Sequence, residues 1–165
     1  MDFTIDALRM GDWPQVRAIY LEGLATGQAT FQTAAPAWEE WDSGHLPQCR
    51  LVARVKETVL GWVALSPTSK RTCYAGVAEV SIYIAAAARG RGVGNALMAA
   101  AVTASEQAGL WTLVSAVFPE NTASLRLHQR HGFREVGRRE RIAQLHGVWR
   151  DTVMLERRSR VVGVA

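Results

Sequence analysis

The residues best suited to chemistry form a turn rich in glycine and arginine that follows an apolar run. The turn lies in the stretch ARGRGVGNAL, shortly after VSIYI, and a single carboxylate, Glu79, immediately precedes that run. The first amides of a helix have no partner within the helix, and glycines let a ligand approach the backbone closely. The turn therefore predicts an anion site, although a tight strand-to-helix connection with solvated arginines has the same pattern.

The residues that follow the glycines narrow the kind of anion. A P-loop needs Lys and Ser or Thr after its last glycine, whereas Gly94 is followed by Asn95 and Ala96. The dinucleotide fingerprint G-x-G-x-x-G/A is matched neither from Gly90 nor from Gly92. The pattern that remains is R/Q-x-x-G-x-G/A, which Arg89, Gly92 and Gly94 satisfy.

The elements that must position this turn follow from hydrophobic periodicity and turn residues. We expect helices over 11–25, 37–44, 92–109 and 120–132, and strands over 3–10, 75–84, 110–118, 133–142 and 148–156, with a hairpin over 50–67 that turns near Lys56 and Glu57. Asp12 and Gln15 have the spacing of a capping box at the start of the first helix. This order predicts an α+β fold around a central mixed sheet.

Length and composition are typical of a globular domain. The chain has 165 residues, of which 48% are hydrophobic and 21% charged. We expect one domain over residues 1–158 and a short tail over 159–165. No apolar run is long enough for a membrane span and the N-terminus does not resemble a signal peptide, so we predict a cytoplasmic protein that does not bind membranes.

Charge and cysteines point to no macromolecular partner. The formal net charge of +4 comes from arginines that are spread over three parts of the chain, which is a poor signal for nucleic acid. A small polyanionic ligand explains it at least as well. Cys49 and Cys73 lack the spacing of a metal site, so we expect reduced thiols and no metal.

The pattern R/Q-x-x-G-x-G/A resembles the pyrophosphate-binding turn of the GNAT superfamily, the acetyl-CoA-dependent N-acetyltransferases. The predicted element order is similar to the GNAT fold over nearly the whole chain. Four stretches also resemble the branch of phosphinothricin and methionine sulfoximine acetyltransferases, namely 29–41, 78–97, 118–137 and 146–156. The resemblance implies a central mixed, mostly antiparallel sheet flanked by helices, and a homodimer.

The resemblance also implies acetyl-CoA as co-substrate and a set of residues that hold it. In GNAT proteins the strand before the turn carries a bulge, and its backbone pairs with the pantetheine arm. The implied cofactor contacts are Ile82, Tyr83, Ile84, Arg89, Gly90, Arg91, Gly92, Val93, Gly94, Asn95 and Asn121. Asn121 also has the position of a helix cap, which is a simpler role.

Acetyl transfer to an amine needs a base for the amine and a proton for the leaving thiolate. The branch resemblance places a general-base glutamate at Glu79, whereas strand alternation alone also allows a merely polar face. Many GNAT proteins have a tyrosine seven residues after the asparagine of the last helix, and here that position is His128. We therefore expect Glu79 and His128 to be catalytic, although a lone helical histidine is often a packing residue.

Three residues are candidates for holding the acceptor. Arg71 and Tyr74 match an Arg-x-x-Tyr arrangement of the branch, in which the arginine would clamp a substrate carboxylate. Phe31 would form the far wall, unless it is ordinary core. The predicted function is direct acetyl transfer from acetyl-CoA to a small amino-acid-like amine. Acetylation of a protein N-terminus or lysine, and a non-catalytic acyl-CoA-binding module, are the alternatives.

Overall fold

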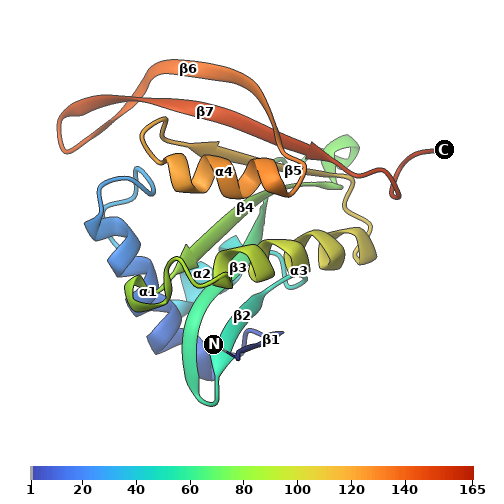
Figure 1. The fold of residues 1–165 in the computed structure, drawn as a ribbon. Helices are drawn as coiled ribbons and strands as arrows, with labels where there is room; N and C mark the ends of the chain where they lie inside the picture. The colour runs from blue at the N-terminus through green and yellow to red at the C-terminus, as the bar shows by residue number, and fades with distance from the viewer. Residues whose placement is uncertain (1) are drawn as a thin grey trace.

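A computed structural model describes residues 2–165 as seven strands in one sheet with four α-helices around it (Figure 1). The sheet order is β1-β2-β3-β4-β5-β7-β6. The strands are β1 (Thr4–Ala7), β2 (Leu51–Val55), β3 (Thr58–Pro67), β4 (Val77–Ile84), β5 (Thr112–Val117), β6 (Arg134–Leu145) and β7 (Val148–Arg158), and the helices are α1 (Trp13–Ala25), α2 (Trp38–Gly44), α3 (Val93–Gln107) and α4 (Thr122–Arg130). The predicted element order is confirmed.

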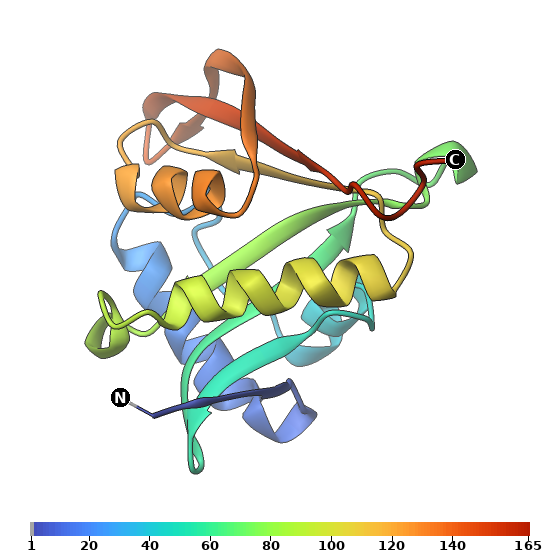
Figure 2. The ribbon, with the colours of Figure 1, turned by 45° about the vertical axis from the view of Figure 1, so that its right-hand side comes forward.

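The sheet is mixed because one pair of neighbouring strands, β4 and β5, runs parallel. The other neighbours are antiparallel. The parallel ladder is short and ends where Glu79 pairs with Val114, although β4 continues to Ile84 and β5 to Val117. The two strands meet at one end and separate toward the other (Figure 2). The expected mixed, mostly antiparallel sheet is confirmed, and its central strands diverge.

Helices cover both faces of the sheet because the buried strands are apolar on both sides. On β3, Val63 and Leu65 face the core beneath α3, where Leu97, Met98 and Ala101 pack. The alternate residues Trp62 and Ala64 belong to a second core beneath α1, with Val16 and Ile19. Figure 2 shows α3 and α1 on opposite sides of β3. Strand β4 lies between the same two cores, because its Ala78 and Val80 belong to the first and its Tyr83 packs against the second.

The start of α1 differs from the expected capping box. Asp12 is the N-cap, but its carboxylate accepts hydrogen bonds from the Arg9 amide at 2.9 Å and from Arg54 at 2.8 Å. The Gln15 side chain contacts the hairpin instead, because its Oε1 accepts from the Val59 amide and its Nε2 donates to the Glu57 carbonyl. Neither side chain bonds to the first turn of α1, because Asp12 contacts the preceding Arg9 and the distant Arg54 while Gln15 contacts the hairpin, so the capping-box prediction is wrong.

The last two strands form a long hairpin that passes above α4 (Figure 1). β6 is the edge strand of the sheet and is exposed over most of its length. Beyond β7 the chain turns back, and Ser159 is buried with its hydroxyl donating to Glu106 at 2.8 Å. Within residues 2–165, no helix combines the length and apolar character that a membrane crossing would need.

Candidate active site

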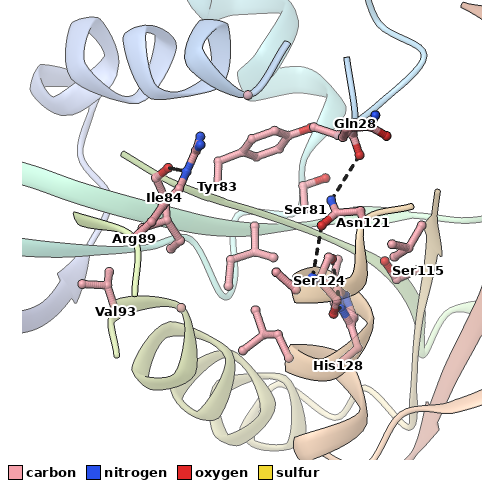
Figure 3. A pocket seen from close by; sticks show the side chains of 18 of the residues that line it. Gln28, Ser81, Tyr83, Ile84, Arg89, Val93, Ser115, Asn121, Ser124 and His128 are labelled. Carbon is pink, nitrogen blue, oxygen red and sulfur yellow. Dashed lines mark hydrogen bonds between the residues drawn. The ribbon is translucent and has the colours of Figure 1, made fainter. Parts of the chain in front are cut away.

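A cavity of about 630 Å³ opens where β4 and β5 separate. Its walls come from five parts of the chain: β4 from Glu79 onward, the turn before α3 with the first residues of that helix, the end of β5, one side of α4 along its length, and the end of α1 with the loop after it. Figure 3 shows these walls with their side chains. Because the divergence leaves the facing edges of β4 and β5 without a strand partner, a ligand can lie between them.

The glycine turn forms one end of this cavity. Gly92 is the N-cap of α3 and adopts φ +83°, a conformation that an L side chain rarely accepts. No side chain caps the helix, so its first amides are available to an anion. Of the predicted cofactor contacts in the turn, Arg91 alone does not line the cavity. The others do: Arg89, Gly90, Gly92, Val93, Gly94 and Asn95. Arg89 donates from Nε to the Ile84 carbonyl at 3.3 Å, which draws it toward the end of β4.

The strand before the turn lines the cavity as expected, but without the predicted bulge. Ile82, Tyr83 and Ile84 all belong to the lining, and the ladder between β3 and β4 runs in one register from Gly61 opposite Ile84 to Pro67 opposite Ala78. The expectation of a bulge in this ladder is therefore wrong. The separation of β4 from β5 is what leaves this edge of β4 unpaired.

Tyr83 shapes the cavity through its ring. The ring stacks on buried Trp62 with centroids 5.0 Å apart and meets Tyr20 edge to face at 4.9 Å. Burial raises the pKa of Tyr83 well above the usual value, so the phenol stays neutral. Gly23 of α1 lies directly against this ring, because a Cβ added there would lie 2.6 Å from it. The ring therefore belongs to an aromatic wall with little freedom to move.

Glu79 lies at the end of the cavity where the two strands meet. It is the first β4 residue in the lining, paired with Ser66 on one side and Val114 on the other. The residue is exposed where the cavity opens, yet the protein around its carboxylate removes enough water for desolvation to raise its pKa. A carboxylate with a raised pKa is a stronger base than an ordinary surface glutamate.

Helix α4 supplies a polar wall opposite β4. Asn121 caps the helix by accepting from the Ser124 amide at 3.2 Å, which agrees with the cap expectation, and its amide nitrogen donates to the Gln28 carbonyl at 3.1 Å. Figure 3 shows Asn121 between Gln28 and Ser124, with His128 one turn further along. Asn121 thus lines the cavity and also ties the helix to the loop after α1.

His128 is buried, with 2% of its surface exposed, and lines the same cavity. Its Nδ1 lies 2.7 Å from the Ser124 carbonyl, which can only accept, so Nδ1 carries the proton. Nε2 is then an acceptor, and it has no hydrogen-bond partner within the described chain. Burial is the main cause that lowers the pKa of His128, so the ring is neutral near pH 7.

The three residues expected to hold the acceptor do not lie in the lining of this cavity. Arg71 and Tyr74 are exposed on the connection between β3 and β4, where the guanidinium lies 5.5 Å from the tyrosine ring centroid. Phe31 is half-buried and meets the buried Phe118 edge to face at 4.9 Å. The structure therefore brings Glu79, His128 and the predicted cofactor contacts other than Arg91 together in one cavity, and leaves Arg71, Tyr74 and Phe31 outside its lining.

Several residues of the site had no sequence signal. Ser115 of β5 and Ser124 of α4 line the cavity, as do Thr26, Gln28, Ala29 and Thr30 of the loop after α1. Arg150 of β7 contacts that loop from outside the lining. No local pattern marks these residues, because they meet through the fold. Among residues 2–165, no three His, Cys, Asp or Glu side chains gather in the manner of a metal site.

Comparisons with known proteins agree with this geometry. Residues 13–133 match the acetyltransferase (GNAT) family. Phosphinothricin N-acetyltransferase of Alcaligenes faecalis is 34% identical over 164 residues, which cover 93% of this chain and 81% of that protein. The L-methionine sulfoximine/L-methionine sulfone acetyltransferase of Pseudomonas aeruginosa is 25% identical over 162 residues, 94% of each chain.

A solved structure has the same fold. The GNAT superfamily phosphinothricin acetyltransferase from Sinorhizobium meliloti, in complex with acetyl-CoA, superposes with a TM-score of 0.88 over 100% of this chain and 92% of that chain, at 26% identity. The GNAT fold and the resemblance to the phosphinothricin and methionine sulfoximine branch are confirmed. The chain therefore belongs to the acetyltransferase (GNAT) family of acetyl-CoA-dependent N-acetyltransferases.

Proposed function

We propose that the protein transfers the acetyl group of acetyl-CoA directly to the amine of a small amino-acid-like acceptor of the phosphinothricin or methionine sulfoximine type. The observation that carries this proposal is a single cavity with the glycine turn at one end and Glu79 at the other. A cofactor bound along β4 would place its acyl end near the carboxylate. The relatives named above support the class of acceptor.

Glu79 is the proposed base. An α-amine with a pKa of about 8 is roughly 90% protonated at pH 7, so it must lose a proton before it can attack. In the transfer, the C–N bond forms, the thioester C–S bond breaks, and the amine proton passes to the Glu79 carboxylate directly or through a water. The raised pKa of this carboxylate brings it closer to that of the amine, which favours proton transfer.

His128 is proposed to contact the sulfur end of the co-substrate. The neutral ring donates from Nδ1 to Ser124, so its Nε2 can only accept a hydrogen bond, for example from the thiol of the product. Protonation of the thiolate by His128 would require the imidazolium form, which burial makes scarce near neutral pH. The Nδ1 contact and the burial of the ring therefore favour an acceptor role for His128, and the leaving thiolate would take its proton from water.

Arg71, Tyr74 and Phe31 remain proposed acceptor contacts. The loop that carries Arg71 and Tyr74 leads directly into β4, and Glu79 is the third residue of that strand. A substrate carboxylate that extends beyond the Glu79 end of the cavity would therefore approach Arg71. Arg71→Ala should raise KM for amines that carry a carboxylate, and Lys70→Ala, the adjacent exposed cation, is the matched control.

Release of free thiol from acetyl-CoA tests the proposed function across a panel of amines. The panel contains phosphinothricin, methionine sulfoximine, methionine sulfone, the common amino acids and a peptide with a free N-terminal alanine. We expect the first three to give the highest kcat/KM. A preference for the peptide would support protein acetylation instead, and acetyl-CoA binding without thiol release for any amine would support a binding module.

We also propose a homodimer and a cytoplasmic location. The β6–β7 hairpin exposes Val136, Ile142, Val148 and Trp149, and β6 is an unpaired edge, features that a second copy would cover. Light scattering should give twice the chain mass, and Trp149→Lys should shift it toward the monomer. Acetyl-CoA is supplied in the cytoplasm, and the free thiols of Cys49 and Cys73 suit a reducing compartment.

A further inference from the structure

The loop after α1, residues 26–31, forms the wall of the cavity that faces α4. Thr26, Gln28, Ala29 and Thr30 line the cavity, and the chain has no helix or strand between Ala25 and Trp38. A loop without its own backbone ladder is held in place by side chains from elsewhere or is free to move. What holds the 26–31 loop therefore decides the shape of this wall.

Arg150 of β7 donates two hydrogen bonds to this loop from a distant part of the chain. Its Nη1 donates to the Gly27 carbonyl at 3.0 Å and its Nη2 donates to Gln28 Oε1 at 2.8 Å. Only 15% of its side chain is exposed. Because the guanidinium donates in two directions from a planar fork, it can hold a main-chain and a side-chain oxygen of consecutive residues together.

The Arg150 guanidinium is itself held in place by Phe118 and Glu120. It lies over the ring of buried Phe118, 4.1 Å from the centroid, and Nη2 pairs with Glu120 at 3.2 Å. The Phe118 ring in turn meets Phe31, the last residue of the loop, edge to face. Arg150 is therefore seated between the base of α4 and the loop, and Phe118 contacts both Arg150 and Phe31.

Gln28 is also held through its main chain. Asn121 Nδ2 donates to the Gln28 carbonyl, so Gln28 is held through its backbone by Asn121 and through its side chain by Arg150. Glu120 and Asn121 are neighbours at the start of α4, which is itself part of the cavity. The loop and the helix are thus joined at one point across the open side of the cavity.

We propose that Arg150 is a positioning residue that holds the 26–31 loop against α4 and thereby sets the affinity of the enzyme for its amine. This inference rests on the proposed function, because it assumes that the amine binds in this cavity. Arg150 does not line the cavity, and none of its contacts reaches the glycine turn. Its loss should therefore affect the acceptor more than acetyl-CoA.

Arg150→Met and Arg150→Lys test the proposal, with Arg134→Met as control. Arg134 lies on the same hairpin and pairs with Glu156 at 2.9 Å, but its side chain is 71% exposed and does not contact the loop. We expect Arg150→Met to raise KM for the amine about tenfold, the effect of losing a hydrogen bond to a charged group, with kcat changed by less than about twofold. Arg150→Lys keeps the positive charge but loses the planar, two-pronged guanidinium, so its KM for the amine should lie between those of the wild type and Arg150→Met.

Hydrogen exchange of residues 26–33 gives a readout that does not depend on activity. We expect faster exchange in Arg150→Met and wild-type exchange in Arg134→Met, while the Kd for CoA stays within about twofold of wild type. If the wild type acetylates no amine of the panel, the proposed function fails, and the exchange data still test the contact between Arg150 and the loop.

Two results would overturn the proposal. One is unchanged exchange and unchanged amine KM in Arg150→Met. The other is an equal weakening of CoA and amine binding, which would indicate a role in the cofactor site or in overall folding. Because Arg150→Lys retains the cation over Phe118, it remains testable if the methionine variant is too unstable.

Discussion

Glu79 pairs with Val114 at the last step of the parallel ladder between β4 and β5. Beyond this pair, Val80 and Ser115 line the cavity instead of pairing with each other. The proposed base therefore lies on backbone that is fixed on both sides, by Ser66 of β3 and by Val114 of β5. A carboxylate held in this way needs little reorganisation to meet a substrate between the diverging strands.

Replacement of the proposed base tests this arrangement. Glu79→Gln keeps the shape of the side chain and removes its basicity, so kcat/KM at pH 7 should fall about 100-fold. The deficit should shrink as the pH rises toward the pKa of the amine, because a larger share of the amine is then free without help. Thiol release measured from roughly pH 6 to 10, a range that includes the pKa of the amine, follows both effects.

Glu57→Gln is the matched control, since Glu57 is an exposed glutamate in the turn between β2 and β3. It should keep the wild-type rate and pH profile. Full activity of Glu79→Gln across neutral pH would show that another group removes the amine proton.

The raised pKa of Glu79 also predicts a change in stability. Because the folded state favours the protonated carboxyl, the stability that Glu79 contributes is present below its unfolded pKa and is lost as the pH rises through the folded pKa. Glutamine resembles the protonated form, so Glu79→Gln should have a higher Tm than the wild type at pH 7. The difference should vanish below about pH 4, the unfolded pKa of a glutamate. Thermal unfolding at both pH values checks the sign, and a lower Tm at pH 7 would contradict it.

The contribution of His128 to stability changes with pH in the opposite direction to that of Glu79. The pKa of His128 is lowered by burial, so the stability that its neutral form contributes is present above the unfolded pKa and is lost as the pH falls through the folded pKa. His128→Gln should therefore reduce the loss of Tm below about pH 6.5. His45 and His131, whose pKa values are also lowered, are present in both proteins and cancel in the comparison. The exposed His146→Gln variant should lose Tm as the wild type does.

The parts of the site that follow one another along the chain could be predicted from the sequence. Glu79, the strand Val77–Ile84 and the glycines before α3 form one continuous stretch, so strand alternation and a turn motif located the strand and the turn. The resemblance to the phosphinothricin branch was needed to single out Glu79 on that strand. The contacts of Arg150 with Gly27 and Gln28 join residues more than 120 positions apart, which no local pattern encodes. The wall of the cavity that these contacts hold could therefore be identified only from the folded structure.

Two structural expectations were wrong, for different reasons. Asp12 and Gln15 have capping-box spacing, but Arg54 and the Val59 amide offer them contacts within the packed fold. The bulge that the GNAT resemblance implied for β4 is absent from the β3–β4 ladder, where the divergence of β5 alone leaves that edge of β4 unpaired. Tertiary structure decided the first case, whereas the second is a departure of this chain from what the resemblance implied.

Alanine variants of Gly92 and Gly109 distinguish an effect on cofactor binding from an effect of backbone strain. Both glycines adopt positive φ, +83° and +81°, at opposite ends of α3, and a Cβ at either position would meet no atom within 4 Å. Alanine at each should cost about 1 kcal/mol of unfolding free energy from strain alone. Gly92→Ala should also weaken CoA binding, because it alters the turn before the first amides of the helix, whereas Gly109→Ala should bind CoA normally. If titration calorimetry gives the same CoA affinity for the two variants, the turn does not contribute to cofactor binding.

Gly23 tests whether the Tyr83 ring forms a fixed wall. A Cβ at Gly23 would lie 2.6 Å from the ring, which is itself stacked on Trp62, so the ring must move if alanine is introduced. We expect Gly23→Ala to cost about 1–3 kcal/mol of unfolding free energy, to change the fluorescence of Trp62, on which the ring stacks, and to lower kcat/KM. Gly11→Ala is the control, because a Cβ there meets nothing within 4 Å. If Gly23→Ala unfolds like the wild type and keeps its activity, the ring is free to move, and the wall at this side of the cavity is adaptable rather than fixed.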